Sequence, residues 1–148
     1  MTRTVLVHLA FILAVMAAGA FIGTSTIPGE WYAGLNKPFF SPPNWVFGPV
    51  WTLIYLMIGW VGARKFLYGG ARGLWGAQMV FNFAWSPVFF GLQLAGIALV
   101  IIALMWMAIV LFIRREWVAD RVSALMFVPY LAWVSFATAL NAAIVLLN

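Results

Sequence analysis

The sequence predicts an all-α integral membrane protein, a five-transmembrane-helix bundle that forms a single domain over residues 1–148. Two observations lead to this prediction. The chain is 66% hydrophobic and only 7% charged, and its apolar runs reach the length of about 20 residues that a helix needs to cross a hydrocarbon core of roughly 30 Å. Backbone groups must bond to one another in lipid, so only helices or closed barrels span it. The runs lack the alternation of a barrel strand, which leaves helices.

The five expected spans are separated by one long loop and three short connections. The third and fourth spans belong to a single apolar stretch from Leu74 to Ile113, which is about two spans long and must turn. The segment Gly91–Gly96 is where the sequence permits that turn. The first span is expected to stay in the mature chain, because no clear signal-peptide cleavage site follows its long apolar run. The spans are expected at about 5–25, 45–66, 73–91, 95–114 and 121–147.

The basic residues are distributed unequally between the two membrane faces. With five spans, the N-terminus and the loops after spans two and four share one face, which carries seven of the eight Lys and Arg residues. The opposite face has only Lys37. This asymmetry predicts a cytoplasmic N-terminus and an external C-terminus in a cytoplasmic membrane, with the basic face contacting lipid headgroups rather than nucleic acid. The seven residues are Arg3, Arg64, Lys65, Arg72, Arg114, Arg115 and Arg121.

The connector between the first two spans, residues 26–44, is the most distinctive segment. Five of the seven prolines lie between Pro28 and Pro49, and proline removes backbone donors and pushes the preceding residue toward extended conformations. The connector also carries several aromatic side chains. Such a long, aromatic loop predicts a lid over a binding site rather than a slack linker.

Polar and aromatic residues recur at helical spacing on three spans. Because amide side chains in lipid need partners, the faces that carry them are expected to point inward. At 1.5 Å per residue, most of them lie about 9 to 15 Å below the outer ends of their spans, and Trp133 about 20 Å. The stripes comprise Trp51 and Tyr55 in span two, Gln78, Asn82, Trp85 and Phe89 in span three, and Tyr130, Trp133, Ala137 and Asn141 in span five.

These stripes predict a ligand pocket with aromatic walls and a few amide donors, on which flat molecules would stack. The lid would close it from above through Trp31, Tyr32, Lys37 and Phe39, with the Lys37 ammonium at the rim available to a ligand carboxylate. A structural alternative stays open on the residues alone. Trp and Tyr are enriched at membrane interfaces, and Asn and Gln also link helices.

The composition also limits the chemistry that the chain can perform. The absence of cysteine excludes disulfides, thiolate metal sites and thiol nucleophiles. Glu30, Glu116 and Asp120 fall in loops or at span ends, so no acid–base or nucleophilic constellation can be assembled within the spans. No metal site and no obligatory cofactor is expected. Two pairs of small residues, Gly19 with Gly23 and Gly73 with Ala77, favour close helix contacts within the bundle or in a homodimer.

Three ordered motifs give the chain a recognisable resemblance. They are Trp31-Tyr32-x-x-Leu35-x-Lys37-Pro38 continuing to Pro42-Pro43-x-Trp45-x-x-Gly48-Pro49-Val50-Trp51-x-x-x-Tyr55, then Asn82-Phe-Ala-Trp85-Ser-Pro87-x-Phe89-Phe90-Gly91, and Pro129-Tyr130-Leu131-Ala132-Trp133 followed by Leu140-Asn141. Over nearly the whole chain, the sequence resembles the translocator protein family. Bacterial members are called tryptophan-rich sensory proteins, and animal members were known as peripheral benzodiazepine receptors.

The resemblance implies a five-helix bundle, often dimeric, that binds porphyrins such as haem and other flat hydrophobic ligands beneath the first loop. Members are proposed to transport tetrapyrroles, to sense them in the regulation of pigment synthesis, or to promote light- and oxygen-dependent porphyrin breakdown. In the last role, the tryptophans that match Trp51 and Trp133 are implicated. Some relatives occupy outer membranes. The pocket residues carried over by the resemblance are Tyr32, Trp51, Asn82, Trp85, Phe89, Trp133 and Ala137.

One departure from the family concerns sterols. The animal proteins carry a cholesterol-recognition pattern that requires a Tyr and then a basic residue after the position of Asn141, and this chain has neither between Asn141 and Asn148. Tight sterol binding by that route is therefore not expected, which leaves the lipid bilayer and, weakly, a sterol as lipid partners. Three functions remain in competition: a tetrapyrrole receptor or transporter, a protein that degrades porphyrin by photochemistry, and a membrane scaffold or chaperone without a ligand.

Overall fold

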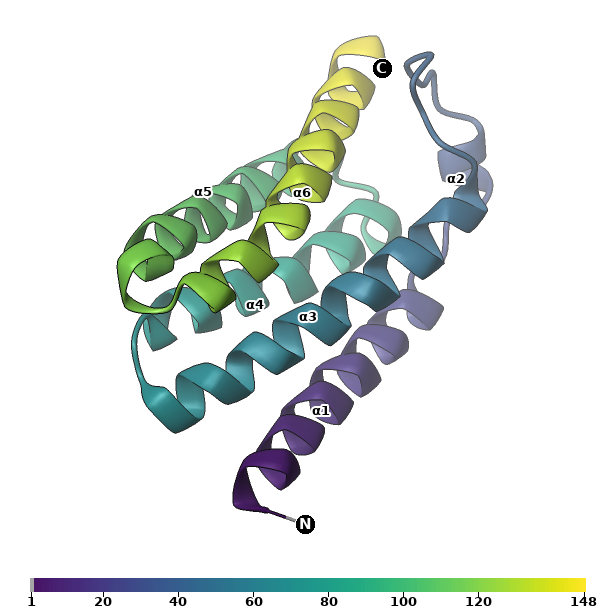
Figure 1. The fold of residues 1–148 in the computed structure, drawn as a ribbon. Helices are drawn as coiled ribbons and strands as arrows, with labels where there is room; N and C mark the ends of the chain where they lie inside the picture. Colours follow the sequence, from purple (N-terminus) through teal and green to yellow (C-terminus); the bar gives the residue numbers. More distant parts are fainter. Residues whose placement is uncertain (1) are drawn as a thin grey trace.

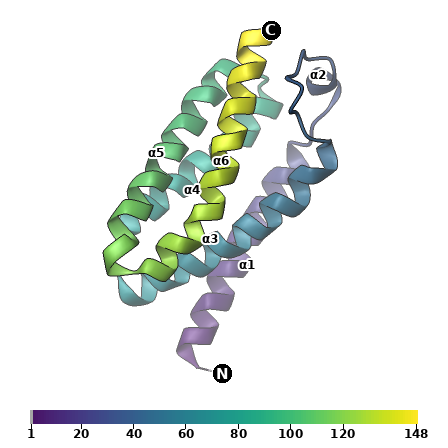
Figure 2. The ribbon, with the colours of Figure 1, turned by 45° about the horizontal axis from the view of Figure 1, so that its top comes forward.

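The computed structural model describes residues 2–148, and this part of the chain folds into a helical bundle (Figure 1). Its two ends differ. The start of the first helix and the turns that follow residues 68 and 119 lie at one end, called the basic end below. Residues 30–33 and the C-terminus lie at the opposite end, called the outer end (Figures 1 and 2). In chain order the elements are α1 (Arg3–Ser25), α2 (Glu30–Ala33), the 3₁₀ turn η1 (Asn44–Val46), α3 (Phe47–Tyr68), α4 (Arg72–Ser86), the π-helical turn η2 (Pro87–Gly91), α5 (Ala95–Ala119) and α6 (Arg121–Leu147).

Four of these helices are long and apolar enough to cross a membrane, as a membrane protein requires. They span Arg3–Ser25, Asn44–Tyr68, Ala95–Ala119 and Arg121–Leu147. The third span expected from the sequence, 73–91, corresponds to α4 followed by η2, because Pro87 begins a π-helical turn in which the Leu92 N–H donates to the Pro87 carbonyl at 2.9 Å. Proline cannot supply the N–H that would continue the α-helical pattern.

Two connections differ in detail from the expected spans. The turn after η2 lies between Gly91 and Ala95, in the expected segment, but Gln93 rather than a glycine takes the positive φ of 60°. The helix α5 runs on to Ala119, past the expected end at 114. It does so because Glu116, in its last turns, is buried and bonded to other helices.

The segment between α1 and α3 forms a cover at the outer end, called the lid below (residues 27–43; Figure 2). It is not wholly irregular, because α2 makes one helical turn within it, and Asn44 already belongs to η1. The lid is tied to the end of α6: the Asn36 N–H donates to Asn148 Oδ1 at 3.0 Å, and Asn148 Nδ2 donates to the Asn36 carbonyl at 2.9 Å.

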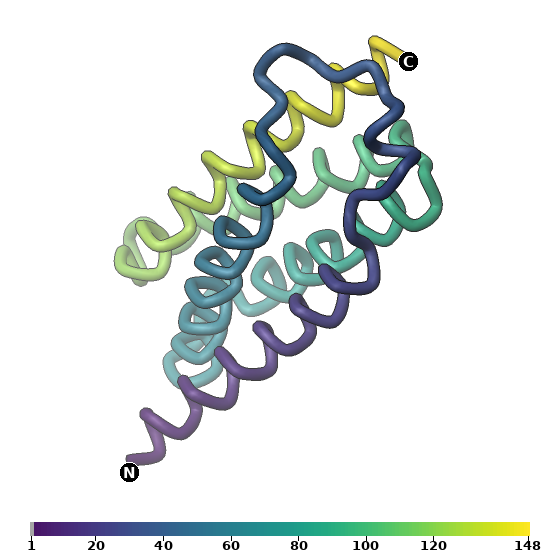
Figure 3. Tube along the Cα trace, turned by 90° about the vertical axis from the view of Figure 1, so that its right-hand side faces the viewer, coloured from purple at the N-terminus to yellow at the C-terminus, as the bar shows by residue number. Residues whose placement is uncertain are grey.

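The helix α1 lies on the outside of the bundle, against α3 (Figure 3). Glycines on α3 allow the close approach: a Cβ on Gly59 would lie 2.7 Å from Ile12 Cα, and one on Gly62 would lie 2.9 Å from Phe11 Cδ1. On α1, Gly19 fits against the Tyr55 ring. One turn further, a Cβ on Gly23 would meet nothing within 4 Å. The two helices are therefore tightly packed up to Gly19 and separate beyond it.

The basic end is held by a buried charge cluster formed by Arg64, Lys65, Glu116 and Asp120. Lys65 and Glu116 are only 3% and 1% exposed, and their side chains pair at 2.8 Å. Glu116 also accepts the Ala71 N–H at 2.6 Å. Arg64 holds Asp120 through two hydrogen bonds of 2.9 and 3.1 Å. The cluster joins the α3–α4 turn to the α5–α6 turn.

Asp120 shows the electrostatic effect of this cluster. Burial alone would raise its pKa, but hydrogen bonds from Arg64, Ser123 and Lys65 outweigh burial and hold the pKa below its usual range. A carboxylate whose folded pKa is lowered stabilises the fold above its unfolded pKa of about 3.9. The contribution of Asp120 is therefore present in full at neutral pH and is lost only as the pH falls through the lower folded value.

Candidate ligand-binding site

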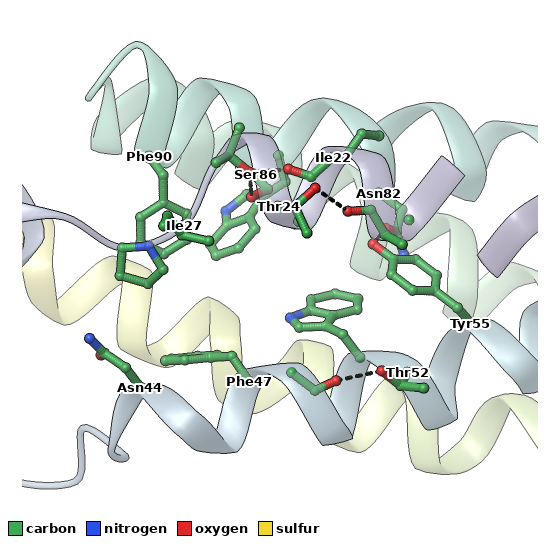
Figure 4. A pocket seen from close by; sticks show the side chains of 18 of the residues that line it. Ile22, Thr24, Ile27, Asn44, Phe47, Thr52, Tyr55, Asn82, Ser86 and Phe90 are labelled. Atoms are coloured by element: carbon green, nitrogen blue, oxygen red, sulfur yellow. Dashed lines mark hydrogen bonds between the residues drawn. The ribbon is translucent and has the colours of Figure 1, made fainter. Parts of the chain in front are cut away.

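The separation of α1 from α3 leaves a cavity of about 500 Å³, called the outer cavity below (Figure 4). Phe47 and Thr52 lie on its α3 side, while Tyr55 and Asn82 close one end and Ile27 and Asn44 lie toward the other. A volume of this size suits a drug-sized organic molecule. The lining residues are Met16, Gly19, Ala20, Ile22, Gly23, Thr24, Thr26, Ile27, Pro28, Asn44, Trp45, Phe47, Gly48, Trp51, Thr52, Tyr55, Asn82, Trp85, Ser86 and Phe90.

The lining is neutral and mostly apolar. Among the described residues, no charged side chain lines the outer cavity. Its hydroxyl protons are largely engaged: Thr52 donates to the Gly48 carbonyl and Thr26 to the Ile22 carbonyl, so Ser86 is left to donate to Thr26 Oγ1 at 2.6 Å. A cavity of this kind favours an uncharged ligand body that makes few hydrogen bonds.

A polar network fixes the closed end of the cavity. Tyr55 donates to Asn82 Oδ1 at 3.1 Å, and Asn82 Nδ2 donates to the Tyr130 hydroxyl at 2.7 Å. Tyr130 in turn donates to Gln78 Oε1 at 2.8 Å, and Gln78 Nε2 donates to the Trp75 carbonyl at 2.7 Å. The amides of α4 therefore bond inward to α3 and α6, as buried polar groups require.

A second, much smaller space lies on the other side of Trp51 and Trp85, and we call it the inner chamber. Its volume is about 10 Å³. It shares Phe47, Trp51, Trp85 and Phe90 with the outer cavity. Its remaining walls are Tyr32, Phe89, Trp133, Ala137, Leu140 and Asn141.

The lid and its neighbours seal the inner chamber. Tyr32 is 3% exposed, and its ring meets those of Phe89 and Phe90 edge-on at 6.2 and 5.4 Å between centroids. Trp31 packs edge-on against Phe89 at 5.5 Å. On the far wall, Trp51 meets Trp133 edge-on at 6.3 Å. The aromatic side chains of three helices and the lid thus meet around one point.

The residues expected from the sequence fall into three groups. Tyr55 and Asn82 line the outer cavity, Trp51 and Trp85 line both spaces, and Tyr32, Phe89, Trp133, Ala137 and Asn141 line the inner chamber. Trp31, Lys37 and Phe39, expected at the rim, line neither space.

Lys37 and Phe39 do not form the cavity rim that the sequence predicts. The Lys37 ammonium donates to three carbonyls of the lid itself, those of Tyr32 at 2.8 Å and of Ala33 and Leu35 at 3.3 Å. Three bonds use all three donors of an ammonium group. Phe39 is fully exposed. In this closed arrangement Lys37 stabilises the lid rather than facing the cavity.

The outer half of α1 supplies a wall that the sequence reasoning did not include. The sequence predicts that Gly19 and Gly23 form a pair for close helix contact within the bundle or in a homodimer; within residues 2–148, Gly19 contacts Tyr55 closely and a Cβ on Gly23 would meet nothing within 4 Å. The sequence signal that indicates this wall is the contrast between the small residues of this stretch and the bulky apolar residues before it. A stretch of this kind gives no indication of whether it faces a helix, lipid or a cavity.

Comparison with known proteins shows to which family the chain belongs. The TspO/MBR family model matches residues 9–147, nearly the whole chain. The chain belongs to the TspO/MBR family. It is 44% identical to the tryptophan-rich protein TspO of Archaeoglobus fulgidus, with 94% of this chain and 95% of that protein aligned. It is 37% identical to the tryptophan-rich sensory protein of Cereibacter sphaeroides, with 87% and 84% aligned, and 38% identical to the human translocator protein, with 83% and 79% aligned.

Membership of the TspO/MBR family agrees with the four apolar helices, and together they identify the chain as an integral membrane protein. The three sequence motifs lie on the elements that surround the two spaces. The first runs from α2 through the lid into α3, the second ends in η2, and the third lies on α6. All three motifs contribute to the walls of the two spaces.

Proposed function

We propose that this TspO/MBR family member is a membrane receptor or transporter that binds tetrapyrroles, such as porphyrin or haem, and similar flat hydrophobic ligands. Through them it contributes to the regulation of tetrapyrrole and pigment synthesis. The observation that carries the proposal is the neutral outer cavity of about 500 Å³ walled by Trp51 and Trp85. Large aromatic rings offer stacking surfaces to a flat ligand, and a mostly apolar lining favours its desolvated body. The name of the Cereibacter relative, a sensory protein, supports a regulatory role.

The proposal includes a membrane arrangement. We propose that α4 and η2, which together cover Arg72–Gly91, form the fifth span and that the lid (residues 27–43) stays outside. The basic end then faces the cytoplasm of a bacterial cell, in the cytoplasmic membrane. A homodimer fits this arrangement, because Gly73 on α4 is exposed and has open space beside it for a second copy.

Filling the outer cavity is expected to abolish ligand binding. Gly23 follows Gly19 by one turn and therefore shares the α1 face that points toward α3, but its Cβ would meet only open space. In Gly23→Phe the new ring occupies the cavity without displacing a neighbour. We expect quenching of Trp fluorescence by protoporphyrin to require at least roughly tenfold more ligand, a loss of about 1.4 kcal/mol. Titration in detergent micelles measures this.

The matched control is Gly96→Phe, which adds the same ring to an exposed, open position at the start of α5. It should bind like the wild type. If Gly23→Phe also binds like the wild type, the ligand does not occupy the outer cavity. If the wild type itself binds no porphyrin but captures other membrane proteins, the scaffold hypothesis is favoured.

A second function, porphyrin degradation, is favoured by one observation. Trp51 and Trp133 are in edge-to-face contact at 6.3 Å between centroids. A ligand stacked on Trp51 would therefore have two neighbouring indoles, each able to donate an electron to a light-excited porphyrin. Molecular oxygen would add to the reduced porphyrin and the electron would return to the indole radical, so that the net reaction combines porphyrin with O₂ to give a ring-opened product.

Under this second function, loss of porphyrin absorbance is expected only with both light and oxygen. Illumination under argon and incubation in air in the dark should each leave the spectrum unchanged. Trp133→Phe should slow the bleaching in light and air, whereas Trp117→Phe, at an exposed indole on the basic end of α5, should not. Equal bleaching in the dark would exclude this photochemical function.

A further inference from the structure

The inner chamber is small enough to select for one chemical group. Its volume of about 10 Å³ is close to the roughly 10–15 Å³ that one water molecule needs. It adjoins the outer cavity through four shared residues, Phe47, Trp51, Trp85 and Phe90. The inner chamber therefore has the size of a single oxygen-sized group of a ligand whose body lies in the adjoining outer cavity.

Two hydrogen-bonding groups of the chamber walls are already paired. Trp85 Nε1 donates to Asn141 Oδ1 at 3.0 Å, and Asn141 Nδ2 donates to the Ala95 carbonyl at 2.9 Å. These bonds satisfy the indole N–H, the amide oxygen and one of the two N–H donors of the amide. They join α4, α5 and α6 at the chamber.

Two other groups of the walls are buried without a partner. Within residues 2–148, the Tyr32 hydroxyl and the Trp133 indole nitrogen make no hydrogen bond although solvent does not reach them. Buried polar groups in proteins are nearly always paired, so each unpaired one indicates a missing partner. An indole N–H can only donate, and a phenol donates readily. The partner missing from this chamber is an acceptor.

The surrounding charges indicate what kind of acceptor fits. Among residues 2–148, Lys37 is the one basic residue at the outer end, and its three donors are used by lid carbonyls. A carboxylate would therefore be buried without a counter-charge, which is strongly unfavourable. The Lys37 ammonium lies 4.8 Å from the centre of the Tyr32 ring, and a cation over a phenol makes its hydroxyl a better donor. This arrangement suits a neutral acceptor.

We infer that the inner chamber is a specificity subsite in which the Tyr32 hydroxyl and the Trp133 N–H recognise one neutral carbonyl oxygen. The ligand is a flat molecule that keeps its apolar body in the outer cavity and projects an ester, amide or ketone group past Trp51. This inference rests on the proposed function, because it assumes that the outer cavity holds the ligand body.

The test compares three porphyrins of similar size by Trp fluorescence quenching. Octaethylporphyrin has no oxygen, mesoporphyrin dimethyl ester has neutral carbonyls, and mesoporphyrin has carboxylates. The wild type should bind the ester about 5- to 10-fold more tightly than octaethylporphyrin, the gain expected for one or two hydrogen bonds. In Tyr32→Phe and in Trp133→Phe this preference should shrink to about twofold or less. Tyr32→Phe should weaken binding of the ester more than binding of octaethylporphyrin, which offers the hydroxyl no oxygen acceptor.

Controls separate recognition from folding. Tyr32→Phe removes only an unpaired hydroxyl, so the unfolding temperature should be equal to or above that of the wild type. Tyr68→Phe, at an exposed position near the basic end, should keep the preference for the ester.

The outcomes distinguish this inference from the proposed function. Binding of the ester and octaethylporphyrin with equal affinity by the wild type, or equal weakening of both in Tyr32→Phe, would overturn the subsite and leave the proposed function intact. Tighter binding of the free acid than of the ester would overturn the choice of a neutral group. If none of the three porphyrins binds, the proposed function itself fails.

Discussion

Replacing Lys65 by methionine is expected to lower the free energy of unfolding by about 3–5 kcal/mol, the range found when one partner of a buried ion pair is removed. Methionine matches the length of the lysine stem but leaves Glu116 with one remaining partner, the Ala71 N–H. Glu116 is 1% exposed, so water cannot replace the ammonium. The measurement is reversible unfolding of the purified protein in mixed micelles.

The double substitution Lys65→Met with Glu116→Gln tests the reason for this loss. It removes both charges, so neither is left unpaired, and it should recover part of the stability lost in Lys65→Met. Arg114→Met is the matched control, because it removes an exposed positive charge from the same end of the bundle. A loss in Lys65→Met no larger than that in Arg114→Met would show that the buried pair does not hold the two turns together.

The charge cluster also illustrates the limit of reasoning from the sequence. The sequence predicts that Lys65 and Glu116 lie near the ends of their helices on one face, and the structure places both at the same end of the bundle. Their pairing joins residues 51 positions apart, and a single sequence carries no signal of which basic and acidic residues of a face will meet. The interpretation of the basic residues as headgroup contacts therefore includes two, Arg64 and Lys65, that instead bond to acidic side chains within the bundle.

Helical periodicity predicts the polar residues of the site better than it predicts the shape of the site. Asn82 and Tyr130 do face each other across α4 and α6, because amides and phenols in an apolar chain must find partners inside. Periodicity cannot show that Trp51 and Trp85 divide the space into a large and a small compartment. That division depends on where the lid places Tyr32 and on how far α1 leans away from α3.

The lid shows how local bonding can override an interpretation based on charge. A single lysine among aromatic residues predicts an ammonium group that is free to bind a ligand carboxylate. The chain around it bends so that three carbonyls converge on the Lys37 ammonium, and the lid gains its own internal support. Such turns of the backbone depend on φ and ψ values that proline and glycine permit but do not specify.

Replacing Trp51 by alanine is expected to weaken porphyrin binding by roughly 10- to 100-fold, which corresponds to about 1.4–2.8 kcal/mol. Trp51 is the central wall of the site. Its ring stacks on Tyr55 at 5.6 Å with planes 28° apart, meets Trp133 edge-on at 6.3 Å, and lines both the outer cavity and the inner chamber. Alanine removes the surface on which a flat ligand stacks and opens the two spaces into one. Contact area and exclusion of water are therefore lost together.

Trp45→Ala distinguishes this central role from a general loss of tryptophan. Trp45 also lines the outer cavity, but its side chain is 74% exposed, so its removal takes little buried surface from a ligand and should change the affinity less than about threefold. Because each variant loses one indole, affinity is best read from the midpoint of the titration rather than from its amplitude. If both substitutions weaken binding equally, the ligand sits near the lid end of the cavity instead of against Trp51. The compartment wall would then not be the recognition surface.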